Sequence, residues 1–330
     1  MGVLQFSLFY LQVFAMQQTF LDYPDNLISI KDFIRWGASQ FSEAGLFFGH
    51  GTTTALDDAA AIVLHTLHLP YQLSETYLDS RLTKIEQQKI FALFKRRIEE
   101  RIPSAYLTRE AIFASLSFYV DDRVLIPRSP ISELIQEGFS PWLENAHSVL
   151  DLCTGSACIA IACAFAFPEA DIDAVDYSQD ALAVAEINVN KFDLNDQVKL
   201  VCSNLFENIP DKQYDLIVSN PPYVSLKEWQ HLPKEYHAEP AMGFKGGKSG
   251  LDLVIKILSQ AKFFLSSDGI LVLEVGSSAQ SLQDLFPEIP FYWLEFERGG
   301  EGVFLMTAQQ VNQYHELFNR SLALLCQETV

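Results

Sequence analysis

The stretch Tyr214-Asp-Leu-Ile-Val-Ser-Asn-Pro-Pro-Tyr223 runs from a short apolar segment into a rigid polar tip. Its first six residues have the length and apolar content of a buried strand. Pro221 and Pro222 each fix φ at about −65° and lack an N–H group. The residue before a proline is also kept out of the helical region. The strand therefore ends in an extended, stiff arm that presents the Asn220 amide and unpaired backbone carbonyl groups.

A planar NH2 group fits this tip. Its two N–H bonds can be donated to the Asn220 side-chain oxygen and to the Pro221 carbonyl oxygen. Tyr223 can then pack on the face of the amide. We therefore take Asn220, Pro221, Pro222 and Tyr223 as the candidate catalytic residues.

Short apolar strands alternate with amphipathic helices around this stretch, which indicates a doubly wound, mostly parallel sheet. The chain ends differently, because two strand-like runs at 291–296 and 303–306 are joined by a Gly-rich turn, so the last strand should be antiparallel. The other expected strands cover 148–153, 172–175, 198–202, 215–219 and 270–275, and the expected helices cover 156–167, a segment that Ser178 caps, and 251–264.

The N-terminal part has helical periodicity instead. Apolar residues at i, i+3, i+4 and i+7 predict three helices near 30–41, 54–67 and 82–100. Two strand runs at 111–120 and 124–126 flank Asp121-Asp122 and predict a hairpin, which a rigid Pro-Arg-Ser-Pro connector at 127–130 follows.

In open α/β sheets a ligand lies beyond the carboxyl ends of the strands. Three predicted strand ends are suited to a nucleotide-like ligand. The first carries a Gly-containing turn without the full GxGxxG spacing, the second carries an acidic residue that can accept from both ribose hydroxyls, and the third is a loop against which adenine can lie. Each also has a purely structural explanation. The candidate cofactor-binding residues are Asp151, Cys153, Thr154, Gly155, Ser156, Ala157, Asp176, Tyr177, Asn204, Leu205 and Asn220.

Taken together, these elements resemble a class I S-adenosylmethionine-dependent methyltransferase. The stretch Phe118-Tyr-Val-Asp-Asp-Arg-Val-Leu-Ile-Pro-Arg-Ser-Pro130 and the helical N-terminal part are similar to the HemK family of protein-glutamine N5-methyltransferases. The resemblance implies a Rossmann-like seven-stranded sheet, an antiparallel last strand and S-adenosyl-L-methionine as cofactor. Within that family, Leu150-Asp-Leu-Cys-Thr-Gly-Ser and Phe167-Pro-Glu-Ala look most like the branch that acts on large-subunit ribosomal protein three.

The resemblance therefore implies methylation of a glutamine in a basic ribosomal protein. Three alternatives stay open: a release factor as substrate, an amino group of a nucleic acid, or a noncatalytic cofactor-binding protein. The implied organisation is a doubtful extension at 1–15, a helical substrate-recognition domain at 16–108, a hairpin and connector at 109–130, the methyltransferase domain at 131–310 and a tail helix at 311–330.

One residue departs from the family pattern. The family turn has Gly where this chain has Ala157. If this position needs a positive φ, its Cβ costs on the order of 1 kcal/mol. We then expect weaker cofactor binding but retained function.

The charge balance argues against naked nucleic acid as a partner. With 42 acidic and 23 basic residues the net charge is −19, whereas phosphate binding depends on clustered Lys and Arg. Such a charge suits a basic protein partner, although simple solubility also explains it.

The five cysteines are an odd number and do not form a secreted disulfide framework, so we expect a cytoplasmic protein. Cys158 and Cys163 should be small buried hydrophobic residues. His65 and His68 have the spacing of helical metal ligands, but nothing nearby completes a site, so we expect no metal. Residues 1–15 are apolar yet too short to span a bilayer. We expect Met16 to be the true start, the alternative being an extra packed helix, and no membrane as a partner.

Overall fold

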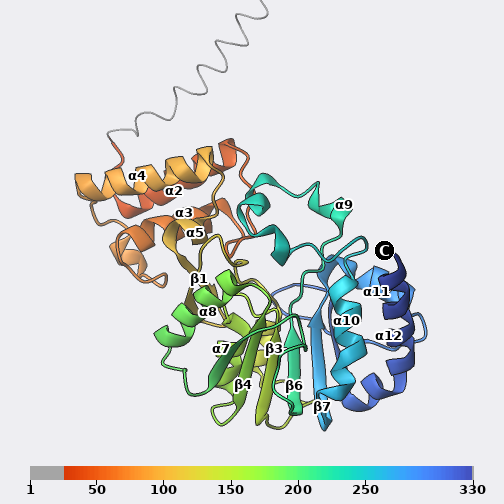
Figure 1. The fold of residues 1–330 in the computed structure, drawn as a ribbon. Helices are drawn as coiled ribbons and strands as arrows, with labels where there is room; N and C mark the ends of the chain where they lie inside the picture. The colour runs from red at the N-terminus through yellow and green to blue at the C-terminus, as the bar shows by residue number, and fades with distance from the viewer. Residues whose placement is uncertain (1–25, 329–330) are drawn as a thin grey trace, which may run out of the picture. The chain divides into compact units, whose positions relative to one another are not determined.

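The computed structural model describes residues 26–328 (Figure 1). The predicted extension and the start at Met16 lie outside the described residues. The chain divides into two compact units, Met1–Thr108 and Arg109–Val330.

The first unit is helical, and the three predicted helices are confirmed. Each begins at a Ser or Thr whose side chain accepts a hydrogen bond from the backbone of the first turn, which satisfies a donor that the helix leaves free. Among the ion pairs of this unit, that between Arg97 and Asp58 is buried, and Arg97 Nε donates to Asp58 Oδ2 at 2.7 Å. The helices are α2 Ile30–Glu43, α3 Ala55–Thr66, α4 Lys84–Glu99 and α5 Ser104–Thr108, with a 3-10 turn η1 Glu75–Tyr77.

The second unit begins with a hairpin, but its turn is not at Asp121-Asp122 as we predicted. Strands β1 Glu110–Phe113 and β2 Leu116–Tyr119 pair antiparallel, and 124–126 forms no strand. The turn lies at Ala114 and Ser115, whose φ values of 48° and 67° are those of a tight hairpin turn. Asp121 instead accepts hydrogen bonds from the backbone N–H and the guanidinium of Arg123.

A seven-stranded sheet forms the centre of this unit, in the order β5-β4-β3-β6-β7-β9-β8. All pairs from β5 to β7 are parallel and β9 is antiparallel to both neighbours, which confirms the predicted sheet with its antiparallel last strand. The run predicted at 291–296 forms only a two-residue strand. The strands are β3 Ser148–Leu152, β4 Asp171–Asp176, β5 Val198–Cys202, β6 Tyr214–Ser219, β7 Leu265–Glu274, β8 Tyr292–Trp293 and β9 Val303–Thr307.

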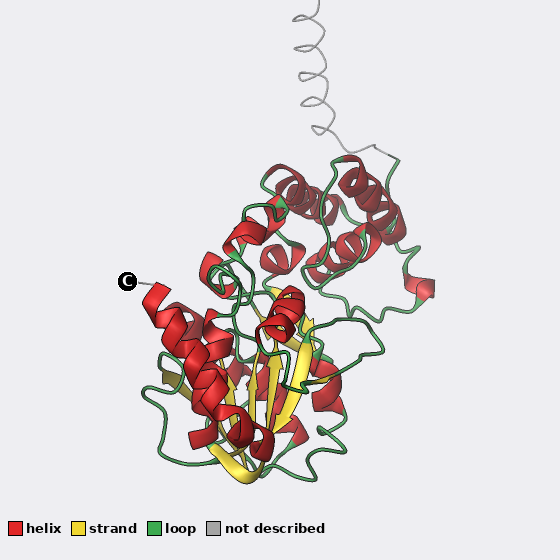
Figure 2. Cartoon of the chain, turned by 90° about the vertical axis from the view of Figure 1, so that its right-hand side faces the viewer, coloured by secondary structure: helices red, strands yellow, loops and turns green. Residues whose placement is uncertain are grey.

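Helices cover both faces of this sheet (Figures 1 and 2). Side chains alternate along each strand, so Val149 packs in the cluster with α7 while Leu150 packs in the opposite cluster with α10. Because both faces are buried, the central parts of the strands are mainly apolar, although buried Asp151 and Asp173 interrupt β3 and β4. The helices are α6 Ile131–Gln136, α7 Cys158–Ala166, α8 Gln179–Lys191, α9 Leu226–Trp229, α10 Asp252–Gln260, α11 Ala279–Leu285 and α12 Ala308–Glu328, with 3-10 turns η2 Lys234–Ala238, η3 Ala241–Gly243, η4 Ala261–Phe263 and η5 Gly276–Ser278.

The cysteines of α7 are buried as predicted, and burial raises the pKa of Cys158 to about 12. Within residues 26–328, no group of three or more His, Cys, Asp or Glu side chains is placed to hold a metal ion. No helix in that range has both the length and the apolar character that crossing a membrane requires.

Candidate active site

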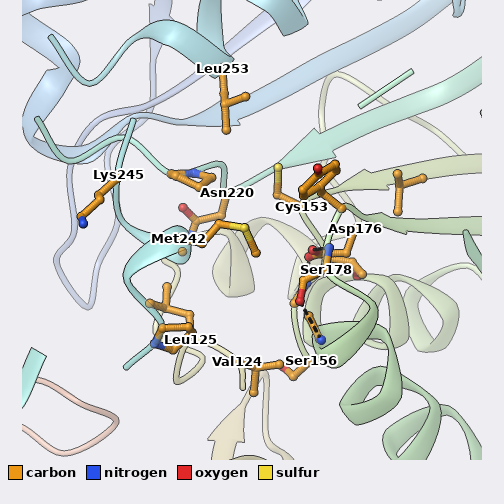
Figure 3. A pocket seen from close by; sticks show the side chains of 18 of the residues that line it. Val124, Leu125, Cys153, Ser156, Asp176, Ser178, Asn220, Met242, Lys245 and Leu253 are labelled. Atoms are coloured by element: carbon orange, nitrogen blue, oxygen red, sulfur yellow. Dashed lines mark hydrogen bonds between the residues drawn. The ribbon is translucent and has the colours of Figure 1, made fainter. Parts of the chain in front are cut away.

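A cavity of about 560 Å³ lies at the carboxyl ends of β3, β4 and β6, the edge where the sequence predicted a ligand (Figure 3). Figure 3 shows Asn220, Met242 and Lys245 toward one side of it and Cys153, Asp176 and Ser178 toward the other. The sequence-predicted residues that line it are Cys153, Thr154, Gly155, Ser156, Asp176, Tyr177, Asn204, Leu205, Asn220 and Pro222, whereas Asp151, Ala157, Pro221 and Tyr223 lie off its wall.

Asp151 supports the turn after β3 from behind. It is fully buried, and its Oδ2 accepts hydrogen bonds from Thr154 Oγ1 at 2.5 Å and from the Ala160 N–H at 3.1 Å. Burial raises the pKa of this carboxyl group to about 7. Asp151 therefore links the turn to the first residues of α7.

Ala157 closes the same turn in a left-handed conformation. Its φ is 62°, it is fully buried, and it immediately precedes α7. We expected weaker cofactor binding if position 157 required a positive φ. The structure shows that it does, and Ala157 carries a Cβ there.

Asp176 lies at the end of β4 and faces the cavity. Its Oδ2 accepts the Gly155 N–H and its Oδ1 accepts the Ser178 N–H, both at 2.9 Å. Burial raises the pKa of this carboxyl group. Each oxygen keeps a second lone pair, so the carboxylate can still accept from a ligand hydroxyl group. Ser178 also caps α8, as predicted, by accepting the Ala181 N–H.

The loop after β5 forms another part of the cavity wall, together with the turn after β3 and the end of β4. Leu205 is buried with a φ of 52°, and the Asn204 side chain donates to Glu207 at 2.7 Å. An apolar side chain and an amide therefore lie together on the wall.

The tip after β6 is enclosed by a Gly-rich segment. A Cβ on Gly246 would lie 2.6 Å from the Pro222 carbonyl oxygen, and one on Gly250 would lie 2.1 Å from that of Tyr223. Ser278 Oγ also donates to the Tyr223 carbonyl oxygen at 2.7 Å. Gly246 and Gly250 thus allow close backbone packing on the tip, because only glycine fits at these two positions.

Two buried carboxylates behind the tip escaped sequence reasoning. Glu274 accepts from the Tyr223 hydroxyl at 2.9 Å and from Ser129 Oγ at 2.5 Å. Glu239 holds Arg128 through two hydrogen bonds of 3.0 Å each. A lone acidic residue at the end of the apolar run Ile-Leu-Val-Leu-Glu274 was the available indication of the first.

Part of the wall was not predicted either. It comes from the connector before α6 and from the segment after the tip. The residues that sequence reasoning missed there include Val124, Leu125, Leu226, Met242, Gly243 and Lys245.

Comparison with known proteins points to one family. A sequence model described as "Methyltransferase small domain" matches residues 132–234. The chain is 51% identical over 289 residues to the ribosomal protein uL3 glutamine methyltransferase of Xanthomonas campestris pv. campestris, covering 87% of this chain and 94% of the relative. It is 47% identical over 288 residues to the protein of the same name from Neisseria meningitidis serogroup B, covering 86% of this chain and 95% of that one.

Among solved structures, a methyltransferase from Pyrococcus furiosus matches with a TM-score of 0.43 and 17% identity, covering 58% of this chain and 88% of that one.

Proposed function

We propose that this chain, which belongs to the family of ribosomal protein uL3 glutamine methyltransferases, transfers a methyl group from S-adenosylmethionine to the side-chain nitrogen N5 of a glutamine in large-subunit ribosomal protein uL3. The observation that carries the proposal is the rigid Asn220-Pro-Pro-Tyr223 tip, whose Asn220 lies on the wall of the same cavity as Asp176. The release-factor and nucleic-acid alternatives become outcomes of the test below.

The donor half of the cavity fits a nucleoside with an amino-acid tail. A cavity of about 560 Å³ falls in the usual range for a cofactor site. Asp176 is positioned to accept from the ribose hydroxyls, and Leu205 offers an apolar surface for adenine, with Asn204 at its edge. The turn from Cys153 to Ser156 lines the remaining part of the cavity and would hold the amino-acid tail of the donor. When bound, the donor supplies an electrophilic methyl group on a sulfonium sulfur.

The acceptor half orients the glutamine amide. Its two N–H bonds would be donated to the Asn220 side-chain oxygen on the cavity wall and to the carbonyl oxygen of the next residue, Pro221, while the half-buried Tyr223 packs on the amide plane. Because Pro221 and Tyr223 lie off the wall of the cavity, the glutamine amide would sit at the edge of the cavity beside the tip. Amide nitrogen is a poor nucleophile, so alignment with the methyl group supplies much of the rate through proximity. The two acceptors become more effective as positive charge develops on the nitrogen. The sulfonium sulfur leaves as a neutral thioether when its methyl group is transferred. No strong general base is needed, because the methylated nitrogen is then strongly acidic and gives its proton to water.

The test incubates the purified chain with labelled donor and an extract from cells that lack this gene. We expect label on ribosomal protein uL3 at a glutamine, identified by mass spectrometry. Asn220→Ala should lower turnover far more than it lowers donor affinity. Label on a release factor or on RNA, or no label in any fraction, would contradict the proposal.

A further inference from the structure

The segment between the tip and the Gly-rich stretch forms a loop that lines part of the cavity. Its two ends meet at Val224, whose N–H group donates to the Phe244 carbonyl oxygen at 2.8 Å and whose carbonyl oxygen accepts the Gly246 N–H at 3.0 Å. Residues 225–243 lie between these ends and contain only the short helical turns α9, η2 and η3. Because such short turns are not stable by themselves, the position of the loop depends on contacts with neighbouring segments.

A buried ion pair fastens this loop to the connector before α6. Glu239 Oε2 accepts from Arg128 Nη1 at 3.0 Å and from the Ile126 N–H at 2.9 Å, and Glu239 Oε1 accepts from Arg128 Nη2 at 3.0 Å. The Glu239 side chain is fully buried, and that of Arg128 is 23% exposed. Two parallel hydrogen bonds between a planar guanidinium and a carboxylate fix both the distance and the angle between the groups. The loop therefore cannot shift along the connector without breaking the ion pair.

Aromatic rings of the loop and its base surround the same guanidinium group. The Arg128 Cζ lies 5.6 Å from the ring centroids of both Tyr236 and Phe244. These two rings pack edge to face with their centroids 5.7 Å apart. A cation within about 6 Å of a ring centroid is attracted to the face of the ring. Arg128 thus contacts the loop in its middle and at its base.

The ion pair brings together apolar side chains from the two segments it joins. Leu125 of the connector and Met242 of the loop both line the cavity, and Figure 3 shows them toward the side of Asn220. A Cβ on Gly243 would lie 3.5 Å from Leu125 Cδ1, so the two segments are in close contact there. Met242 and Leu226 also line the cavity and are 51% and 48% exposed. Exposed apolar side chains on the wall of a cavity are suited to contact a bound partner.

We infer that Arg128 and Glu239 are positioning residues for the protein substrate, because their ion pair holds the loop 225–243 against the connector. The loop and the connector then form a fixed apolar surface for the residues that flank the target glutamine. This inference rests on the proposed function, in which the glutamine amide sits beside the tip. The turn after β3 and the end of β4 form the donor side of the cavity, so the ion pair should act on the protein substrate and not on the donor.

The test replaces the Glu239 carboxylate with an amide of the same shape. In Glu239→Gln the guanidinium loses its counterion, and the amide NH2 group cannot accept from Arg128. We expect the KM for ribosomal protein uL3 to rise on the order of 10- to 100-fold while kcat stays within about threefold, as for the loss of contacts made equally to substrate and transition state. The dissociation constant of the donor, measured by calorimetry, should stay within about threefold of wild type, because Glu239 lies off the cavity wall.

Asp173→Asn is the matched control. The Asp173 side chain is 1% exposed, and its Oδ2 accepts from Lys212 Nζ at 2.7 Å and from the Tyr214 hydroxyl at 2.9 Å. It is thus also a buried carboxylate paired with a cation, but it lies off the cavity wall. Both variants should lower the melting temperature, whereas only Glu239→Gln should raise the KM. A KM that rises equally in both variants, or in neither, would overturn the positioning role.

A second measurement follows the loop itself and needs neither donor nor substrate. Amide hydrogen exchange, measured by mass spectrometry in peptides that cover 226–243, should be at least about tenfold faster in Glu239→Gln than in wild type. Asp173→Asn should leave the exchange of these peptides unchanged. Arg128→Lys keeps the charge but cannot form two parallel hydrogen bonds, so it should accelerate the exchange to a smaller extent. This milder variant takes the place of Glu239→Gln if the latter does not fold.

The two measurements separate this inference from the proposed function. Failure of the wild type to methylate ribosomal protein uL3 would sink the proposed function, whichever way the loop behaves. Unchanged exchange of the loop peptides in both Glu239→Gln and Arg128→Lys would sink the inference, because the ion pair would then not hold the loop.

Discussion

Asp151 shows how a single buried carboxyl group makes stability depend on pH. Its pKa is raised to about 7, whereas an unfolded Asp has a pKa of about 3.9. Between these values the folded protein binds the proton more tightly, so the stability of the fold decreases as the pH rises. We expect wild type to lose stability relative to Asp151→Asn from about pH 5 to pH 7, by at most about 1.4 kcal/mol per pH unit.

Chemical denaturation of both proteins across that range measures this difference. Exposed Asp180→Asn controls for the change in net charge. If the difference in free energy of unfolding between wild type and Asp151→Asn stays constant with pH, the pKa of Asp151 is not raised.

Asp176 should act on donor binding instead of on turnover. Asp176→Ala removes an acceptor placed on the cavity wall, and a hydrogen bond to a charged group contributes about 1.5–3 kcal/mol. We therefore expect the dissociation constant of S-adenosylmethionine to rise by roughly 10- to 100-fold, measured by calorimetry. At saturating donor, kcat should stay within a few-fold of wild type. Asp180→Ala, on the first turn of α8 and exposed, should change neither quantity. A loss confined to kcat would contradict the assignment.

Some residue-level features could be predicted from the sequence and others could not. Two prolines constrain their own backbone, so the stiffness of the tip at Asn220 follows from local chemistry. The Ala157 expectation was conditional on φ, which only the structure supplies. Glu274 could not be placed because its partners Tyr223 and Ser129 lie 51 and 145 residues away along the chain. Long-range hydrogen bonds of this kind leave no periodic pattern.

The packing of the Gly-rich segment 246–250 on the tip can be tested by comparing Gly250→Ala with Gly299→Ala, because these two glycines have nearly the same φ. Gly250 has a φ of +83° and Gly299 a φ of +80°, but a Cβ on Gly299 meets nothing within 4 Å. Each change to Ala should cost on the order of 1 kcal/mol from backbone strain. Gly250→Ala should lose further stability and most of its kcat, because its Cβ displaces the Tyr223 backbone. Chemical denaturation and turnover measurements on both variants test this expectation. If Gly250→Ala and Gly299→Ala lose the same stability and the same kcat, the contact between Gly250 and the Tyr223 backbone is unimportant.

The elements that the sequence predicted best are those with a strong repeating pattern. The sheet strands and the helices α2, α3 and α4 were predicted from apolar periodicity. Thr54 and Thr83, which cap α3 and α4 in the structure, were not used in that prediction. The hairpin turn was wrong because Ala114 and Ser115 are not residues that normally favour a positive φ. The Asp121-Asp122 pair resembled a turn, yet Asp121 serves as the acceptor for Arg123.

The whole molecule carries a net charge of −19, and its effect should appear in the encounter with a basic substrate. Long-range attraction between opposite charges speeds association and is screened by salt, with a Debye length of about 10 Å at 0.1 M. Contacts inside a cavity are screened much less. Salt should therefore act on capture of the proposed protein substrate and not on the chemistry.

Steady-state kinetics at low and high salt test this expectation. With ribosomal protein uL3 as substrate, kcat/KM should fall by about tenfold or more between roughly 20 and 300 mM salt, while kcat stays nearly constant. A short neutral peptide that carries the target glutamine should show little salt dependence, because it has no charge to be attracted. If salt lowers kcat/KM equally for both substrates, or for neither, the negative charge serves solubility and plays no part in substrate capture.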